Sequence, residues 1–419
     1  MRTRLALLVA LAALAGCAER ERINPFDPEN GTTLGRPSGF VALAGDGGIR
    51  LQWEAVIGEG LIGYKIFRRT SPDSAFRPIT GTLPLTTTQY IDFGLLNGLD
   101  HEYQIFFVFD RGLGIDPATD IATPGHRVPW MVDGASGLLA RLTADGRHVA
   151  ERRTSLVSPS AVTIDSLSHV VWASDPGGQV SGQVGLLDMD VGIFLTTPGF
   201  GSPGEIATQP RDSTAWVCDE ESGKVIHLDS RGGRPLPIIQ GLNTPTGVAI
   251  DPVDGTIWVC ERNGDHVIRY DENVSPISTT SVVHPSRVAI DASTHEAWVT
   301  SATQQVVHRL DPAGTVVDTY TGFSGPVGIQ VDSRRGRIWI ADPAANRVTV
   351  LDRDGSVVHQ IPGLPGARAL AIDYESGEAW VALAGSGEIV WLSPAGTVIR
   401  RLGGFTLPLG VAIRPWPAT

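Results

Sequence analysis

From residue 125 onward the chain repeats one arrangement of apolar runs and polar turns. Each unit opens with a proline-rich turn and an apolar run ending in aspartate, as in residues 245–251, followed by a run around a tryptophan, as in residues 256–259. A third run, as in residues 266–271, also ends in aspartate, and a more variable fourth run follows. Short apolar runs bounded by turn residues are typical of β-strands, so the pattern predicts four strands in each unit.

Tryptophans set the period of this repeat, because they recur at intervals of 40 to 44 residues. The seven are Trp130, Trp172, Trp216, Trp258, Trp298, Trp339 and Trp380. Four strands per unit of this length are typical of a β-propeller blade, whose sheet can bury both faces only by stacking on neighbouring sheets. We interpret each tryptophan as a wedge between sheets, with truncation to alanine costing about 3–5 kcal/mol. The alternative is an aromatic platform for a ligand.

The two ends of the repeat region each carry part of a blade. Residues 410–414 match the first strand of a unit but have no tryptophan strand after them, whereas Trp130 begins a unit that lacks a first strand. Pairing the two fragments would close the ring and remove two exposed sheet edges. The sequence therefore predicts an all-β propeller of seven blades over residues 125–419, with the C-terminal strand innermost in the Trp130 blade.

The strands and turns of this region resemble the NHL repeat family. Residues 326–332, 337–342 and 346–352 follow the family's frame, whereas Ser301 and Leu383 stand where other blades have an acid. The family is usually six-bladed, which is the alternative to seven. Lyases with an NHL-like propeller bind metal through histidines in the central channel. No channel position of this repeat recurs as histidine, so we expect no metal and no cofactor, and we assign no catalytic residue.

Residues 37–124 form a different pattern of alternating apolar and polar positions. Half-buried strands are expected at residues 40–43, 49–53, 64–67, 90–92 and 103–108. Trp53, Tyr64 and the pair Leu99 and Tyr103 resemble the landmarks of a fibronectin type III module. This resemblance implies a two-sheet immunoglobulin-like sandwich with a tyrosine corner at Tyr103. Such modules usually act as spacers or adhesion units.

The first residues predict export and a lipid anchor. A positive start precedes an apolar run over residues 5–16, which suits a signal peptide but is too short to span a bilayer. Residues 14–17 resemble the lipobox of bacterial lipoproteins, which implies cleavage after residue 16 and acylation of Cys17. Residues 17–36 then serve as a tether. We expect a protein anchored to the membrane of the cell envelope and facing the periplasm or the exterior. The alternative is an ordinary signal peptide with a chance cysteine.

Charge and cysteine content narrow the possible partners. The net charge of −12, about −14 without the predicted leader, repels phosphate backbones and excludes a nucleic-acid partner. Cys218 and Cys260 each lie two residues after a repeat tryptophan. Packed sheets lie about 10 Å apart, farther than a disulfide reaches, so we interpret both as small packing residues, with a disulfide as the alternative.

Charged residues that interrupt the repeat are candidates for ligand binding. The unit start usually has a small residue, as in Gly247, but Glu205 and Arg287 replace it and Arg368 lies one position earlier. We expect these three at the mouth of the central channel, as a polar rim for an anionic or sugar-like ligand; the alternative is solvated loop residues. By contrast, we interpret the aspartates that end the first strands as turn formers that accept backbone N–H groups, rather than as calcium ligands or catalytic groups. They are Asp165, Asp251, Asp291, Asp332 and Asp373.

These features favour a scaffold or binding protein of the cell envelope, with an unknown protein or glycan ligand on the propeller. The alternative function is a lyase or lactonase with a metal or carboxylates in the channel. Propellers host both functions, so the fold alone does not choose between them.

The closure of the ring can be tested by truncation. Deleting residues 405–419 should unfold the propeller, because the Trp130 blade would lose its inner strand. The ring would also lose the contacts of that strand with the two neighbouring blades. Thermal unfolding followed by circular dichroism measures this, and a truncated protein with unchanged melting would refute the closure.

Overall fold

The computed structural model describes residues 26, 30, 35–165, 167–178, 181–189, 192–209, 211–233 and 237–413. The predicted signal peptide, Cys17 and residues 414–419 lie outside the described residues. The described part is all-β, as predicted, and its one helix is the 3-10 turn η1 (Pro343–Ala345). None of its segments is a helix long and apolar enough to cross a membrane. The chain divides into two compact units, Met1–Gly125 and His126–Thr419.

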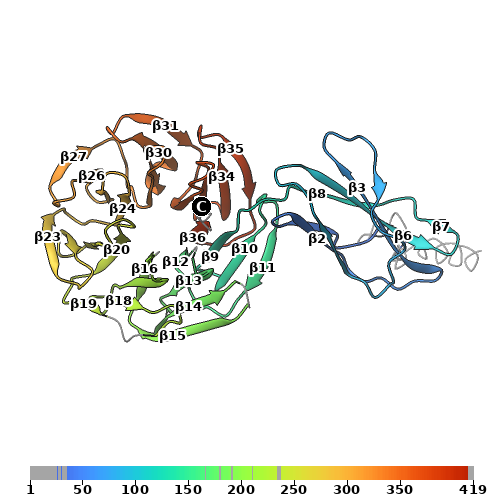
Figure 1. The fold of residues 1–419 in the computed structure, drawn as a ribbon, viewed down its shortest axis with the longest axis horizontal. Helices are drawn as coiled ribbons and strands as arrows, with labels where there is room; N and C mark the ends of the chain where they lie inside the picture. Colours follow the sequence, from blue (N-terminus) through green and yellow to red (C-terminus); the bar gives the residue numbers. More distant parts are fainter. Residues whose placement is uncertain are drawn as a thin grey trace, which may run out of the picture. The chain divides into compact units, whose positions relative to one another are not determined.

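The first unit contains two antiparallel sheets (Figure 1). One consists of β1 (Val41–Ala44), β2 (Gly48–Gln52) and β5 (Gln89–Phe93). The other consists of β4 (Arg77–Pro78), β3 (Leu61–Thr70), β6 (His101–Phe109) and β7 (Gly112–Leu113), with β8 (Ala118–Ala122) also paired to β6. The short strands β4 and β7 and the polar strand β8 were not expected from the sequence. Trp53 and Tyr64 are buried between the sheets with ring centroids 5.5 Å apart.

The predicted tyrosine corner differs from the observed arrangement. Tyr103 is fully buried, but its hydroxyl donates to the Oδ2 of Asp92 at 2.9 Å, and Arg68 donates to the same oxygen at 2.7 Å. Leu99, expected as part of the corner, remains 37% exposed. The buried carboxylate of Asp92 therefore joins strands of the two sheets, a pairing that no local sequence pattern signals.

In the second unit the described residues form seven four-stranded antiparallel sheets arranged around a central axis (Figure 1). From the axis outward, the first three sheets are β36 (Pro408–Ile413), β9 (Pro129–Asp133), β10 (Leu138–Leu142) and β11 (Val149–Arg153); β12 (Ala161–Asp165), β13 (Val170–Asp175), β14 (Gly182–Asp188) and β15 (Phe194–Phe200); and β16 (Pro203–Gln209), β17 (Thr214–Asp219), β18 (Lys224–Leu228) and β19 (Ile238–Gln240).

The remaining four sheets follow the same order of strands. They are β20 (Pro245–Ile250), β21 (Ile257–Glu261), β22 (His266–Tyr270) and β23 (Pro276–Ser281); β24 (Arg287–Asp291), β25 (Glu296–Ser301), β26 (Val306–Leu310) and β27 (Val316–Tyr320); β28 (Ile329–Asp332), β29 (Arg337–Asp342), β30 (Arg347–Asp352) and β31 (Val357–Pro362); and β32 (Ala367–Ile372), β33 (Ala379–Leu383), β34 (Glu388–Leu392) and β35 (Val398–Leu402).

The innermost strands close into a ring through the C-terminal strand. β36 pairs with β9 in the register Gly410 to Val132 and Ala412 to Trp130, which is the pairing expected from the sequence. β36 also packs against the inner strands β32 and β12 of the two neighbouring sheets. The first and last parts of the repeat region therefore share one sheet, and the ring is held by a contact between its two ends.

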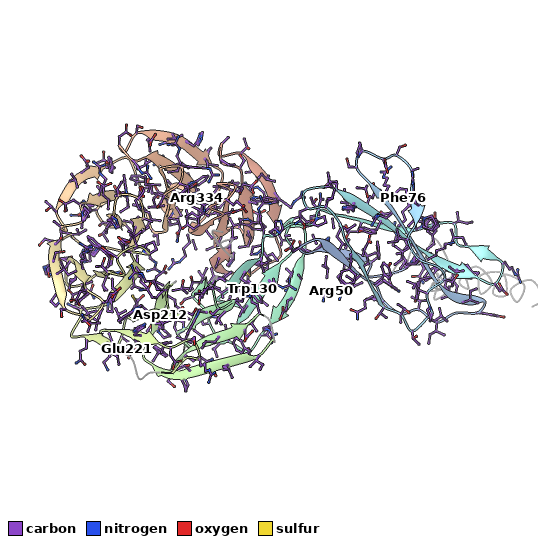
Figure 2. All side chains as sticks on the ribbon, in the orientation of Figure 1. Arg50, Phe76, Trp130, Asp212, Glu221 and Arg334 are labelled. Atoms are coloured by element: carbon purple, nitrogen blue, oxygen red, sulfur yellow. The ribbon has the colours of Figure 1, made fainter. Side chains whose placement is uncertain are left out.

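Packing between the sheets depends on the tryptophans and their cross-strand partners. All seven repeat tryptophans are buried, with at most 3% of any of them exposed, and Figure 2 shows side chains filling the spaces between sheets, with Trp130 labelled. Residues directly opposite in an antiparallel pair project from the same face of the sheet. The inner-strand partner of the tryptophan is alanine in five sheets: Ala207, Ala249, Ala289, Ala371 and Ala412. A small partner leaves room for the indole.

Aspartates that end the inner strands accept backbone N–H groups, which is the role proposed for them. Asp251 accepts from Val253 and Asp291 from Ser293. Asp291 also receives the Nε of Arg353, from the following sheet, at 2.6 Å. Equivalent contacts from the following sheet join Arg127 to Asp373 and His295 to Asp251. Each of these aspartates therefore fixes its own turn and connects two neighbouring sheets.

A second set of acids lies at the ends of the strands that carry the tryptophans. Asp175, at the end of β13, accepts the backbone N–H groups of Val157 and Ser158, both at 2.8 Å. Asp133, Asp219 and Asp342 each bind two successive N–H groups in the same way. In every case these N–H groups belong to the loop that leads into the inner strand of the same sheet. Ser301 replaces the acid in one sheet and donates to the carbonyl of Val283 instead.

The ion pair between Arg353 and Asp291 predicts acid sensitivity. Burial opposes the charge of Asp291, but hydrogen bonds from Arg353 and Ser293 outweigh it and lower its pKa below the ordinary 3.8. A carboxyl with a lowered pKa in the folded state contributes stability above about pH 4 and loses it as the pH falls further. We expect Arg353→Gln to reduce the free energy of unfolding by about 1–2 kcal/mol at pH 7. The deficit should shrink at pH 3.

Denaturant unfolding at both pH values measures this effect. Arg231→Gln, at an exposed turn residue, is the control and should match the unchanged protein. An equal deficit for Arg353→Gln at pH 3 and pH 7 would contradict the assignment.

Candidate functional site

The central channel of the second unit is a cavity of about 800 Å³. Its lining comes from the inner strands of all seven sheets and the residues that flank them. Each inner strand is hydrogen-bonded to a neighbour on one side only, and no two inner strands belong to the same sheet. Such an edge strand leaves half of its backbone N–H and C=O groups facing the channel. The wall therefore offers hydrogen-bond donors and acceptors along its whole length.

Small residues surround the mouth at the start of the inner strands. The inner-strand residue opposite the position two after the tryptophan is Gly247, Gly410, Ala161 or Ala369 in four sheets. A Cβ on Gly247 would lie 2.9 Å from the Cα of Arg287, so neighbouring inner strands approach closely here. In this register β24 is an exception, because it has a large residue, Arg287, opposite Thr300 of β25. Its side chain extends along the mouth rather than between the strands.

Glu205 and Arg287 form an ion pair across the mouth. The Nε of Arg287 lies 2.9 Å from the Oε2 of Glu205, and its Nη1 donates to the carbonyl of Thr246 on the strand between them. Burial opposes the charge of Arg287, but its negatively charged neighbours, Glu205 foremost and Glu220 with it, together outweigh burial and raise the pKa of the guanidinium. These two residues, predicted as part of one rim, are brought together by the fold, and most of their charge is neutralised by their pairing.

Arg368 lies at the same mouth but remains unpaired. It occupies a β-bulge between Ala367 and Ala369, and a bulge turns its residue away from the regular strand direction. The side chain is open to the channel, and it makes no hydrogen bond or salt bridge with the residues that the structure describes. The residue is exposed at the mouth, but desolvation there, with Arg287 and Arg262 close by, lowers the pKa of this guanidinium. The mouth therefore holds one uncompensated cation.

The strand assignments refine where the three predicted residues lie. They were expected just before the inner strands, but Glu205 is the third residue of β16, Arg287 the first of β24 and Arg368 the second of β32. All three line the channel. At the opposite mouth, which no sequence pattern indicated, Arg334, labelled in Figure 2, lines the channel with Tyr374 and Glu375.

Both cysteines are free thiols, buried near the mouth that holds Glu205 and Arg287. Burial raises the pKa of Cys218, and it raises the pKa of Cys260 to about 12. A thiol must ionise to act as a nucleophile, so neither cysteine is suited to catalysis in the folded protein. The packing role holds, and the alternative disulfide is not formed.

Among the described residues, Asp251, Asp254 and His295 form a group whose donor atoms could surround a cation. Their hydrogen bonds argue for a structural role instead. Asp251 receives the N–H of Val253 and lies 2.7 Å from the Nδ1 of His295, while Asp254 binds Thr256 and Arg269. At the equivalent position of two other sheets, Asp291 and Asp373 bind an arginine of the following sheet. We therefore interpret this group as a turn-stabilising contact.

Comparison with known proteins supports the fold. No family model matches the chain, and no curated protein matches it. The chain is similar to a proposed 6-phosphogluconolactonase from Bacteroides uniformis, with a TM-score of 0.59, 14% identity, and coverage of 68% of this chain and 99% of that one. A functionally unknown protein from Desulfotomaculum acetoxidans gives a TM-score of 0.58 at 14% identity, covering 69% and 99% of the two chains. Virginiamycin B lyase from Staphylococcus aureus gives 0.51 at 17%, covering 59% and 84%. At these identities the likeness establishes a β-propeller and nothing about its chemistry.

Proposed function

We propose that this protein is a lipid-anchored binding protein of the cell envelope that holds a small anionic ligand at the Arg368 mouth of its channel. The observation that carries the proposal is the unpaired guanidinium of Arg368 in a channel of about 800 Å³. An exposed guanidinium with no carboxylate partner among the described residues is free to bind an anionic ligand. Guanidinium groups also bind carboxylates and phosphates in a two-pronged geometry that favours such ligands.

The surroundings of Arg368 support an anion rather than a cation. Glu205 is engaged by Arg287 at 2.9 Å, and Glu220 lies 3.9 Å from Arg262. Both of these carboxylates are thus balanced by a neighbouring arginine. The site keeps one positive charge although the whole chain carries −12.

Binding is favoured over catalysis by the state of the reactive groups near this mouth. Glu205 is held in an ion pair, and both thiols are buried with raised pKa values. None of these is poised as a nucleophile or as a general acid. The alternative of a lyase or lactonase is supported by the names of the similar propellers alone. Elemental analysis separates the two, because a stoichiometric divalent metal would favour the enzyme.

The anchor and the first unit complete the proposal. Acylation of Cys17 would tether the protein, since two acyl chains bind a membrane stably. The two sheets of the first unit, with Trp53 and Tyr64 between them, support a fibronectin-like spacer. In this arrangement the propeller reaches its ligand from the membrane surface.

Replacing Arg368 tests the binding site. We expect Arg368→Gln to weaken binding of a small carboxylate such as benzoate by about tenfold or more, because a charge-assisted hydrogen bond of about 1.5–3 kcal/mol is lost. Isothermal titration calorimetry measures the affinity, and Arg231→Gln is the matched control. Failure of acetate, benzoate and inorganic phosphate to bind the unchanged protein, or equal affinity of Arg368→Gln, would reject the site.

Replacing Cys17 tests the anchor. In bacterial cells that process lipoproteins, the unchanged chain should partition with membranes and carry acyl chains detectable by mass spectrometry. Cys17→Ala should lose both properties, because the acylated thiol is gone. Acyl-free protein in the soluble fraction of cells expressing the unchanged chain would contradict the anchor.

A further inference from the structure

The seven sheets provide an internal reference for each position of the channel wall. Where the inner strand lies opposite the tryptophan, five sheets have alanine, but β12 has Thr163 and β28 has Gln330. One residue further along the strand, six sheets have an aliphatic residue, but β16 has Thr208. The six are Ile164, Ile250, Ile290, Val331, Ile372 and Ile413. Packing therefore does not require a polar group at either position.

These three polar residues share two further properties. Thr163, Thr208 and Gln330 all line the channel and are partly exposed in it. Within the described ranges, none of their side chains makes a hydrogen bond to another residue. A polar side chain that replaces an apolar one, without a partner of its own, gains nothing for the fold. Each one offers the channel a hydrogen-bonding group beyond those of the strand edges.

Two of these residues lie at one register, deeper in the channel than Arg368. Gln330 and Thr163 occupy the same register, two steps along the inner strands from the Ala369 register beside which Arg368 lies. At about 3.3 Å per residue, this places the polar register roughly 7–10 Å deeper in the channel than Arg368. This separation is comparable with one pyranose ring that carries a carboxylate at one end and hydroxyls at the other. β28 and β32 are neighbours, so Gln330 and Arg368 lie on the same side.

The backbone groups of the strand edges favour the same kind of ligand. An apolar ligand would cover these N–H and C=O groups without replacing their hydrogen bonds to water, which is unfavourable for each group left unpaired. A ligand with several hydroxyls can satisfy them. Sites built to bind hydroxyls discriminate strongly against analogues that lack them, because their own polar groups would remain unpaired.

We infer that the ligand is an acidic sugar, a uronic acid either free or at the end of an oligosaccharide. Its carboxylate would bind Arg368, and its ring hydroxyls would bind Gln330, Thr163 and Thr208. This inference rests on the proposed anion site and specifies its substrate class. The cavity of about 800 Å³ has room for more than one sugar ring.

Three probes of similar size separate charge from hydroxyls. Glucuronate carries both, cyclohexanecarboxylate carries the charge alone, and methyl glucoside carries the hydroxyls alone. Calorimetric titration of the full chain should show glucuronate binding at least about tenfold more tightly than either of the others. Arg368→Gln should weaken glucuronate to the level of methyl glucoside.

Gln330→Ala then tests the polar register. Alanine is the residue that five sheets have at this position, so the variant should fold normally, and thermal unfolding checks this. We expect it to weaken glucuronate about tenfold while leaving cyclohexanecarboxylate unchanged. Gln304→Ala, in an exposed turn, is the control and should bind both ligands as the unchanged protein does.

The outcomes distinguish the two proposals. Equal binding of glucuronate and cyclohexanecarboxylate, both weakened by Arg368→Gln, would overturn the acidic sugar and retain the anion site. An unchanged glucuronate affinity in Gln330→Ala would also overturn the sugar contacts alone. Binding of methyl glucoside as tightly as glucuronate, or no binding of any probe, would reject the anion site and the inference together.

Discussion

The close approach of the inner strands at one mouth is the constraint on which the second unit depends. A Cβ on Gly328 would lie 2.3 Å from the backbone oxygen of Arg368, and one on Gly410 would lie 3.1 Å from the backbone nitrogen of Val162. Strands can converge this closely only where side chains are absent or small. A larger residue is tolerated where its side chain turns along the mouth or into the channel, as those of Arg287 and Arg368 do. Packing thus decides where charges can stand.

Away from the axis the sheets diverge, and larger groups fill the space between them. The tryptophans occupy this space, and in five sheets the inner-strand residue opposite the tryptophan is alanine. Buried aspartates such as Asp175 then hold the loops that enter the inner strands. Others, such as Asp291, bind an arginine of the next sheet. Sheets that carry both kinds of aspartate are therefore attached to their own loop and to the next sheet.

Repetition made the fold predictable, whereas the contacts of the site were not. The tryptophan period gave the four-strand units, and the incomplete ends gave the pairing of β36 with β9. Glu205, Arg287 and Arg368 were found because they break that period. Their pairing was not foreseen, since Glu205 and Arg287 lie on sheets separated by a third, and the bulge that frees Arg368 has no sequence signature. Thr163 and Gln330 were missed because only the register shows that they replace alanine.

A repeat also separates groups that serve the fold from groups that serve a ligand. Residues present in most sheets serve the fold: the tryptophans are packed between sheets, and the buried aspartates accept hydrogen bonds from nearby loops. The exceptions at the mouth divide into two kinds. Arg287 forms an ion pair with Glu205, but Arg368 has no counterion among the described residues. A chain with 45 acidic residues had many ways to supply a carboxylate here. Arg368 is exposed at the channel mouth beside other arginines, where its pKa is lowered. The repulsion between these cations would be relieved by a counterion, which the described residues do not supply. A partner from outside the chain is therefore the simplest reason for its presence.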